Sequence, residues 1–157
     1  MFVSAILAAA GRGTRLGAAM PKQMLTLGDR TILQHSFAVV DNHEQIDEIV
    51  VALPPDLAWS PPPYLISSKK PVRIVDGGDR RQDSVAKAFA QVSQSATVIV
   101  IHDAARPFAT AELFSRVIEA AAKGGAAIAA VPAMTSGLKS VPNVRSFCMR
   151  GMVSFMA

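Results

Sequence analysis

The chain has 157 residues, half of them hydrophobic and 18% charged, which predicts one hydrophobic core and a single α/β domain rather than two domains. No apolar run approaches the roughly 20 residues that span a bilayer, so we expect no membrane partner. The single cysteine, Cys148, excludes an internal disulfide; it fits a reducing compartment, and we expect a cytoplasmic protein.

The formal net charge of +4 comes from the C-terminal part of the chain. Residues 1–119 contain twelve Lys and Arg and twelve Asp and Glu, whereas residues 120–157 contain four basic residues and no acidic one. No helix carries a basic stripe and no aromatic residues are interleaved with the charges. We therefore expect no nucleic-acid partner.

Predicted strands and helices alternate along the chain. Apolar, β-branched runs predict strands at 3–9, 48–53, from Val72, at 97–101 and at 126–131. Helical spacing of apolar residues predicts helices at 31–42, 84–92 and 110–123, the first with Thr31 as N-cap and the last ending at Gly124-Gly125. This alternation predicts a mostly parallel sheet with helices on both faces.

A proline-rich stretch interrupts this alternation. Pro54-Pro55 and Pro61-Pro62-Pro63 bracket residues that we expect to form a stiff excursion at the surface. Within this excursion, Trp59 and Tyr64 are expected to pack locally.

A glycine-rich, basic loop follows the first predicted strand. Gly11 and Gly13 allow a sharp turn that brings backbone N–H groups against phosphate oxygens. Arg15 and Lys22 supply positive charge where pyrophosphate would leave. The loop is not a Walker A loop, and a dinucleotide fingerprint needs a small residue where Arg15 stands. The pattern predicts nucleotidyl transfer; the alternative is an ordinary strand-to-helix turn with two surface arginines.

Two further polar clusters, 75–85 and 100–107, also follow apolar strands. All three clusters would lie at the carboxyl ends of parallel strands, where open α/β sheets bind ligands. The alternative for the second cluster is a solvated, mixed-charge helix start. The alternative for Asp103 is a helix cap or a pair with Arg106. We expect His102 to be a core residue rather than a base, because a phosphate nucleophile is already anionic.

Together the three clusters resemble those of the 2-C-methyl-D-erythritol 4-phosphate cytidylyltransferases of the non-mevalonate isoprenoid pathway. The resemblance runs from about Phe2 to Pro132. Its segments, in order, are AAAGRGTR (8–15), PKQ (21–23), DGGDRRQDSV (76–85) and HDAARPF (102–108). The resemblance implies a Rossmann-like nucleotidyltransferase fold. It also implies transfer of a cytidylyl group from CTP to 2-C-methyl-D-erythritol 4-phosphate, with release of pyrophosphate.

The resemblance also implies roles for individual residues. Arg15 and Lys22 would be catalytic cations that stabilise the pentavalent α-phosphate, and Asp103 would bind Mg²⁺, which prefers oxygen ligands. The implied nucleotide-binding residues are Ala8, Ala9, Ala10, Gly11, Arg12, Gly13 and Thr14 in the phosphate loop, Gly78, Asp79 and Ser84 on the base and ribose side with Arg81 in support, and Ala104 and Arg106.

The chain departs from the family's pattern after Pro132. The family continues with an Asp-Thr motif, a dimerisation arm, acceptor contacts and a second magnesium carboxylate, and we find none of these. We expect residues 1–132 to form the nucleotide-binding core and 133–157 an atypical tail outside the family fold. The expected enzyme is thus truncated at its C-terminus, and a family-like homodimer would lack its arm. A cytidylyltransferase for another sugar-alcohol phosphate, such as ribitol phosphate, and an inactive nucleotide-binding remnant are the alternatives.

Overall fold

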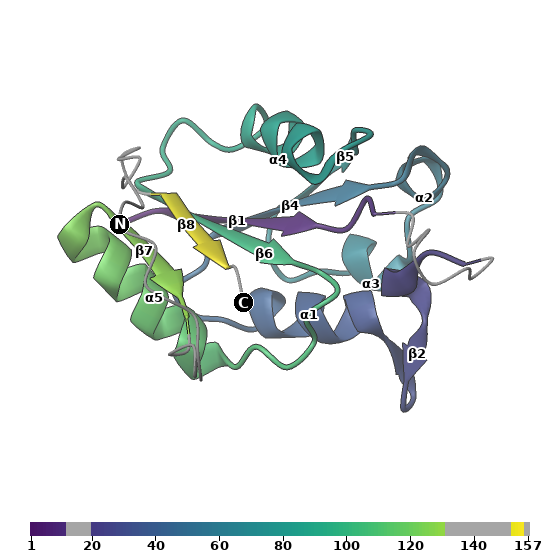
Figure 1. Cartoon of the computed structure of the whole chain (residues 1–157), viewed down its shortest axis with the longest axis horizontal. Helices are drawn as coiled ribbons and strands as arrows, with labels where there is room; N and C mark the ends of the chain where they lie inside the picture. Colours follow the sequence, from purple (N-terminus) through teal and green to yellow (C-terminus); the bar gives the residue numbers. More distant parts are fainter. Residues whose placement is uncertain (12–19, 131–151, 156–157) are drawn as a thin grey trace, which may run out of the picture.

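The computed structural model describes residues 1–11, 20–130 and 152–155, and its elements form a parallel sheet covered by helices (Figure 1). The strands of the main sheet are β1 (Val3–Ala8), β4 (Glu48–Leu53), β5 (Val72–Asp76), β6 (Val98–Asp103), β7 (Ala126–Ala129) and β8 (Met152–Phe155). Their order is β5-β4-β1-β6-β8-β7, and every pairing is parallel. The parallel sheet expected from the alternation of elements is confirmed.

The helices are α1 (Ile32–Asp41), α2 (Pro55–Trp59), α3 (Pro63–Ile66), α4 (Arg81–Phe89), α5 (Ala111–Gly124) and a short 3₁₀ helix, η2 (Lys22–Met24). Thr31 caps α1 as predicted, because its hydroxyl accepts a hydrogen bond from the Gln34 N–H. Helix α4 begins at Arg81 rather than at the predicted Ser84. The Asp83 carboxylate accepts a hydrogen bond from the Arg80 N–H and so caps this earlier start.

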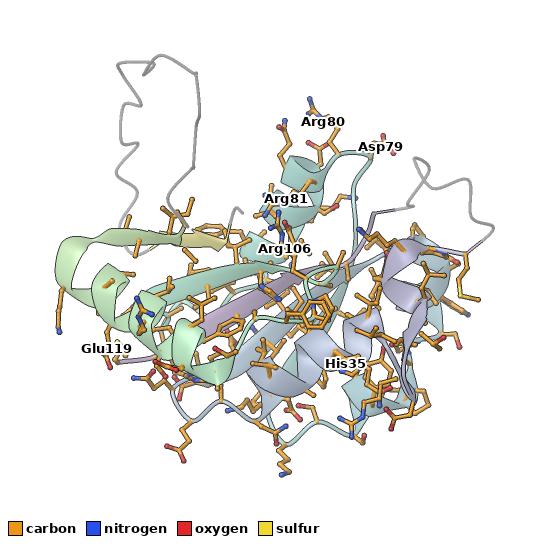
Figure 2. All side chains as sticks on the ribbon, turned by 60° about the horizontal axis from the view of Figure 1, so that its bottom comes forward. His35, Asp79, Arg80, Arg81, Arg106 and Glu119 are labelled. Atoms are coloured by element: carbon orange, nitrogen blue, oxygen red, sulfur yellow. The ribbon has the colours of Figure 1, made fainter. Side chains whose placement is uncertain are left out.

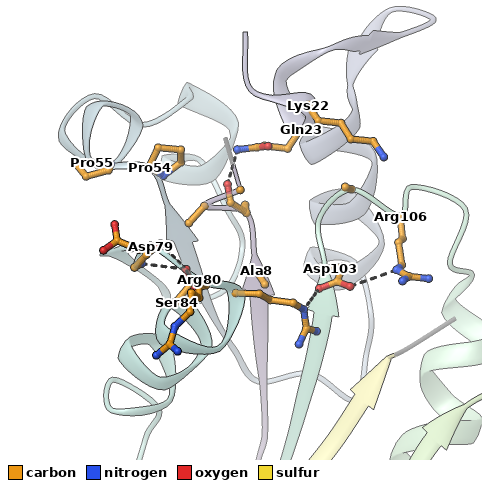
Figure 3. Close-up of a pocket in the computed structure, with 17 residues that line it drawn as sticks. Ala8, Lys22, Gln23, Pro54, Pro55, Asp79, Arg80, Ser84, Asp103 and Arg106 are labelled. Carbon is orange, nitrogen blue, oxygen red and sulfur yellow. Dashed lines mark hydrogen bonds and ion pairs between the residues drawn. The ribbon is translucent and has the colours of Figure 1, made fainter. Parts of the chain in front are cut away.

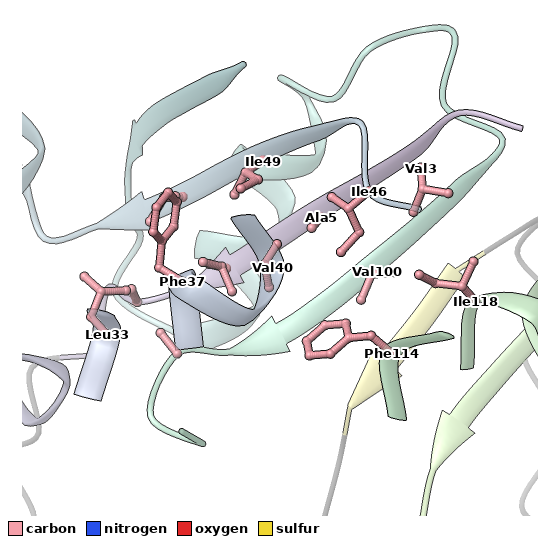
Figure 4. Close-up of a cluster of buried hydrophobic side chains, with 14 of the residues drawn as sticks. Val3, Ala5, Leu33, Phe37, Val40, Ile46, Ile49, Val100, Phe114 and Ile118 are labelled. Atoms are coloured by element: carbon pink, nitrogen blue, oxygen red, sulfur yellow. The ribbon is translucent and has the colours of Figure 1, made fainter. Parts of the chain in front are cut away.

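Helices cover both faces of the sheet, with α4 on one face and α1 and α5 on the other (Figure 1). Strand side chains alternate between the faces, so that Leu7 packs with the core under α1 and α5 while Ile6 packs with the smaller core under α4. Figure 4 shows the larger core, in which Phe37 of α1 and Phe114 of α5 contribute large side chains. Burial of this apolar surface is the main force that holds the helices on the sheet.

The proline-rich stretch contains the short helices α2 and α3, which the sequence pattern did not predict. They form because proline at the first helical position needs no N–H partner and its backbone angle suits a helix. Trp59 is 92% exposed and does not pack locally. Tyr64 instead packs against Phe37 of α1 with ring centroids 6.0 Å apart, and burial raises the pKa of its hydroxyl.

Two further features were not predicted. A two-stranded antiparallel hairpin, β2 (Thr26–Leu27) with β3 (Arg30–Thr31), turns at Gly28 with φ +68° and leads from η2 into α1; its strands are too short to show a periodicity. Strand β8 lies between β6 and β7, so part of the tail joins the main sheet. The domain boundary at residue 132 stays a prediction.

The described residues include no helix that is both long and apolar enough to cross a membrane.

Candidate functional site

A pocket of about 960 Å³ lies where the parallel strands end (Figure 3). The predicted site residues that line it are Ala8, Ala9, Ala10, Gly11, Lys22, Gly78, Asp79, Arg81, Ser84, Asp103 and Arg106. Arg12, Gly13, Thr14 and Arg15 lie outside the described residues. The structure therefore brings the described parts of all three sequence clusters together, as the position of ligand sites in open α/β sheets predicts.

Ala104 is the one described residue of the predicted set that does not line the pocket. Its side chain is fully buried, and its neighbour Ala105 lines the pocket instead. The Ala104 N–H donates to the Ala8 carbonyl and its carbonyl accepts from the Ser36 hydroxyl. Ala104 thus joins the ends of β1 and β6 to α1, and the place of its side chain in the core follows from strand alternation beside Asp103.

The first loop is held firmly where it leaves the sheet. The Ala9 N–H donates to the Ala52 carbonyl at 2.9 Å and so extends the pairing of β1 with β4 by one residue. The side-chain amide of Gln23 donates to the Ala9 carbonyl at 2.5 Å. A Cβ on Gly77 would lie 2.0 Å from the Cβ of Ala10, so only glycine permits this approach of the two loops.

Gln23 belongs to the motif at 21–23, but the sequence pattern assigned no role to it. It is 3% exposed and lines the pocket. The one signal in the sequence was its position directly after Lys22, the predicted catalytic cation. A single glutamine between Lys22 and Met24 belongs to no apolar periodic pattern, and for that reason its burial could not be predicted from the sequence.

Hydrogen bonds within the turn between β5 and α4 hold its backbone in place. The Ser84 hydroxyl accepts from the Gly78 N–H at 3.0 Å and donates to the Arg80 carbonyl at 3.2 Å. The Lys87 ammonium donates to the Gly77 carbonyl at 3.0 Å. Ser84 is 3% exposed, so its hydroxyl lies at the floor of the pocket and keeps the turn in shape for any ligand above it.

The outer end of this turn carries exposed charge. Asp79 and Arg80 lie at its tip, as Figure 2 shows, and both line the pocket. The hydrogen bond from the Arg80 guanidinium lowers the pKa of the Asp83 carboxyl. Asp83 is therefore ionised at neutral pH, and its carboxylate accepts hydrogen bonds from Arg80 of the same turn.

Asp103 stands at the carboxyl end of β6 between two arginines (Figure 3). Its Oδ1 lies 2.7 Å from the Nε of Arg81, and its Oδ2 lies 3.3 Å from the Nε of Arg106. The pair with Arg106, weighed as an alternative for Asp103, is therefore present. It does not preclude a metal, because an ionised carboxylate has about four lone-pair positions.

The donor set around Asp103 fits Mg²⁺ only together with a ligand. Among the described residues, no group of three His, Cys, Asp or Glu side chains could hold a metal by itself. Mg²⁺ commonly uses one or two protein carboxylates and completes its coordination with waters and substrate phosphates. The one carboxylate of Asp103 is suited to that arrangement.

The side chain of His102, the residue before Asp103, points away from the pocket into the core beneath α5. It is 1% exposed and meets the Phe114 ring edge-on at a centroid distance of 5.2 Å. Burial lowers its pKa to about 4. The expectation that His102 is a core residue is confirmed by its burial, while its exclusion as a base stays a prediction.

The described part of the pocket lining is positively charged overall. It contains four basic residues, Lys22, Arg80, Arg81 and Arg106, and two acidic ones, Asp79 and Asp103. Figure 2 shows Arg81 and Arg106 lying close together between α4 and the end of β6. This balance favours a ligand with several negative charges, such as a nucleoside triphosphate.

Comparisons with known proteins give a consistent result. A family model described as 2-C-methyl-D-erythritol 4-phosphate cytidylyltransferase matches residues 3–147. The bifunctional enzyme IspD/IspF of Dinoroseobacter shibae is 42% identical over 133 residues, which cover 83% of this chain and 32% of the relative. The 2-C-methyl-D-erythritol 4-phosphate cytidylyltransferase of Alkaliphilus metalliredigens is 35% identical over 133 residues, covering 83% of this chain and 55% of the relative.

Solved structures show the same likeness. The cytidylyltransferase from Thermus thermophilus is 35% identical, with a TM-score of 0.61 over 80% of this chain and 53% of that one. The 4-diphosphocytidyl-2C-methyl-D-erythritol synthase from Anaerococcus prevotii is 28% identical, with a TM-score of 0.70 over 81% of this chain and 54% of that one. The chain thus spans about half, or less, of the length of these proteins.

Proposed function

Because the chain belongs to the 2-C-methyl-D-erythritol 4-phosphate cytidylyltransferase family, we propose that its pocket binds CTP together with a divalent cation. The bound nucleotide is then presented for transfer of its cytidylyl group to methylerythritol phosphate. One observation carries this proposal. Three motifs far apart in the sequence line a single pocket at the carboxyl edge of the sheet, and their side chains give it excess positive charge.

Each part of the pocket has a task in this proposal. Backbone N–H groups of the loop after β1 bind the phosphates, as glycine-rich turns do in other nucleotide sites. The turn between β5 and α4 binds the base and ribose through Gly78 and Asp79, with Ser84 beneath. Lys22, which is exposed at the pocket rim, neutralises charge on the triphosphate, with Arg15 assigned the same task by the family resemblance.

The chemistry needs no general base. A phosphate oxygen of the acceptor, already anionic, attacks the α-phosphorus of CTP; a new P–O bond forms, and the bond to pyrophosphate breaks with its electrons leaving on the pyrophosphate oxygen. Positively charged groups stabilise the extra negative charge of the transition state. His102 is excluded from proton transfer by its burial, which agrees with a reaction that moves no proton.

Asp103 would hold the cation. When bound, Mg²⁺ neutralises phosphate charge and orients the triphosphate. Arg81 and Arg106 then have two roles: they keep the Asp103 carboxylate in place before the ligand arrives, and they face the phosphates once it is bound. No observation favours ribitol phosphate over methylerythritol phosphate as the acceptor.

Calorimetric titration of the purified chain with CTP and Mg²⁺ tests the nucleotide site. We expect saturable binding that weakens about tenfold or more in both Asp103→Asn and Lys22→Met. Asp103→Asn loses the carboxylate that would hold the cation, and Lys22→Met loses a charged contact to the triphosphate. Lys69→Met removes one exposed lysine outside the pocket and serves as the control. No binding by the unchanged chain, or equal binding by all variants, contradicts the proposal.

Pyrophosphate release tests the transfer separately. The chain is incubated with CTP and Mg²⁺, with and without methylerythritol phosphate. Release that depends on the acceptor supports the complete proposal. CTP binding without release assigns nucleotide binding to this chain and rejects turnover by it.

A further inference from the structure

Gln23 makes the contact on which this inference rests. The residue belongs to η2 and is 3% exposed, and its Nε2 donates to the Ala9 carbonyl at 2.5 Å. A buried amide of this kind is costly unless it is hydrogen bonded. Gln23 therefore joins η2 to the loop after β1 through a bond between a side chain and the backbone of that loop.

The planarity of the peptide group extends the effect of this bond. In a trans peptide, the carbonyl of one residue and the N–H of the next point in opposite directions within one plane. All peptide bonds in the described residues are trans. When Gln23 holds the Ala9 carbonyl on its own side, the Ala10 N–H must point away from Gln23. Ala10 lines the pocket.

The Ala9–Ala10 peptide is the point where the sheet stops determining the backbone. The Ala9 N–H still pairs with the Ala52 carbonyl of β4. Among the described residues, by contrast, nothing accepts a hydrogen bond from the Ala10 N–H. Beyond Ala9, the orientation of the peptide depends on Gln23 on one side and on the close packing of Gly77 on the other.

We infer that Gln23 is a positioning residue that orients the Ala9–Ala10 peptide and so directs the Ala10 N–H at a phosphate of the bound nucleotide. The inference rests on the proposed function for the identity of the ligand. Because Lys22 directly precedes Gln23 on η2, the same bond places the backbone that carries the Lys22 side chain relative to the loop. The backbone donor and the lysine are then presented as one preorganised unit, which lowers the ordering cost of binding.

The test uses variants of nearly equal size. Gln23→Glu keeps the shape, but when ionised it places a carboxylate oxygen against the Ala9 carbonyl and turns the peptide. When protonated it donates again, so its defect should disappear at low pH. Gln23→Met keeps the volume but never donates. Gln91→Glu, on an exposed residue after α4 that does not line the pocket, adds the same charge as a control.

Two measurements separate the inference from the proposed function. Residual dipolar couplings report the orientation of the Ala10 N–H bond without any ligand. We expect the coupling to change in Gln23→Met at every pH and in Gln23→Glu at pH 8, and to return towards the unchanged chain at pH 5 in Gln23→Glu alone. Calorimetry with CTP and Mg²⁺ should show about tenfold weaker binding wherever the coupling has changed. Affinities are compared with those of the unchanged chain at each pH.

An unchanged Ala10 coupling in both variants overturns the inference. A changed coupling with unchanged CTP affinity overturns the role of Gln23 towards the nucleotide. If the unchanged chain binds no CTP, the proposed function fails, while the couplings still decide whether Gln23 orients the peptide. If Gln23→Glu misfolded and the pocket lost its shape, CTP binding would be weakened equally at pH 8 and pH 5. Such a loss without recovery at pH 5 also counts against the inference.

Discussion

Two carboxylates at opposite ends of the parallel sheet are each paired with arginine, yet their surroundings differ. Glu48 begins β4, and its side chain is 4% exposed. It accepts hydrogen bonds from the Ser4 hydroxyl and the Ser93 N–H, both at 2.6 Å, and from Arg73 at 3.1 Å. Asp103 ends β6 with its side chain 21% exposed, and its partners are the side chains of Arg81 and Arg106.

The difference lies in the donors. Two of the three donors to Glu48 are short groups whose positions are set by the strand and the backbone, so its oxygens cannot be released without leaving buried polar groups unpaired. The arginine side chains that bind Asp103 are 45% and 41% exposed, are flexible and face a pocket. An ion pair inside a closed network stabilises the fold, whereas the same pair at an open pocket can be exchanged for a ligand.

The largest expected effect comes from breaking the closed network. Glu48→Ala should lower the free energy of unfolding by about 3 kcal/mol, because it leaves the Ser4 hydroxyl and the Ser93 N–H without their acceptor. Urea denaturation measures the loss. Glu44→Ala, at an exposed position on the same segment, should cost less than about 0.5 kcal/mol. An equal loss in both variants would mean that the Glu48 network contributes nothing specific.

A second prediction concerns His102, the buried neighbour of Asp103. Its pKa is about 4 in the folded chain and 6.5 for an unperturbed histidine, so the unfolded chain binds more protons between these values. Stability is therefore fully present above pH 6.5 and falls as the pH drops towards 4, by about 3 kcal/mol in all. His102→Leu should flatten this part of the stability profile measured by urea denaturation. An equally steep profile in His102→Leu would refute the assignment of this pH dependence to His102.

The smallest expected effect tests exchange at the open pair. Arg81→Met should change stability by less than about 1 kcal/mol, because the pair is partly exposed. It should also strengthen binding of Mn²⁺ to the nucleotide-free chain a few-fold, since Asp103 loses a competing cation. Electron paramagnetic resonance of free Mn²⁺ measures this affinity. Arg80→Met, which removes a partner of Asp83 instead, is the matched control; weaker Mn²⁺ binding in Arg81→Met would show that Arg81 supports the site rather than competes for it.

The place of the site could be predicted from the sequence better than the contacts within it. Parallel strands bring their carboxyl ends together, and for that reason the order of the motifs after β1, β5 and β6 was enough to assign them to one pocket. The role of Gln23 could not be predicted, because its burial depends on where η2 packs. The exposure of Trp59 was misjudged and the burial of the Ala104 side chain was not foreseen for the same reason, since exposure is decided by neighbours distant in the sequence.

The sequence within each segment was enough to predict the alternation of strands and helices, the cap at Thr31 and the three polar clusters. These features depend on residues within a few positions of one another. Only the tertiary structure decided which of two similar carboxylates is enclosed and which faces a ligand. That choice depends on the packing of Ser4 against Glu48 across neighbouring strands and on the approach of α4 to the end of β6. Contacts between segments far apart in the chain leave no pattern in either segment alone.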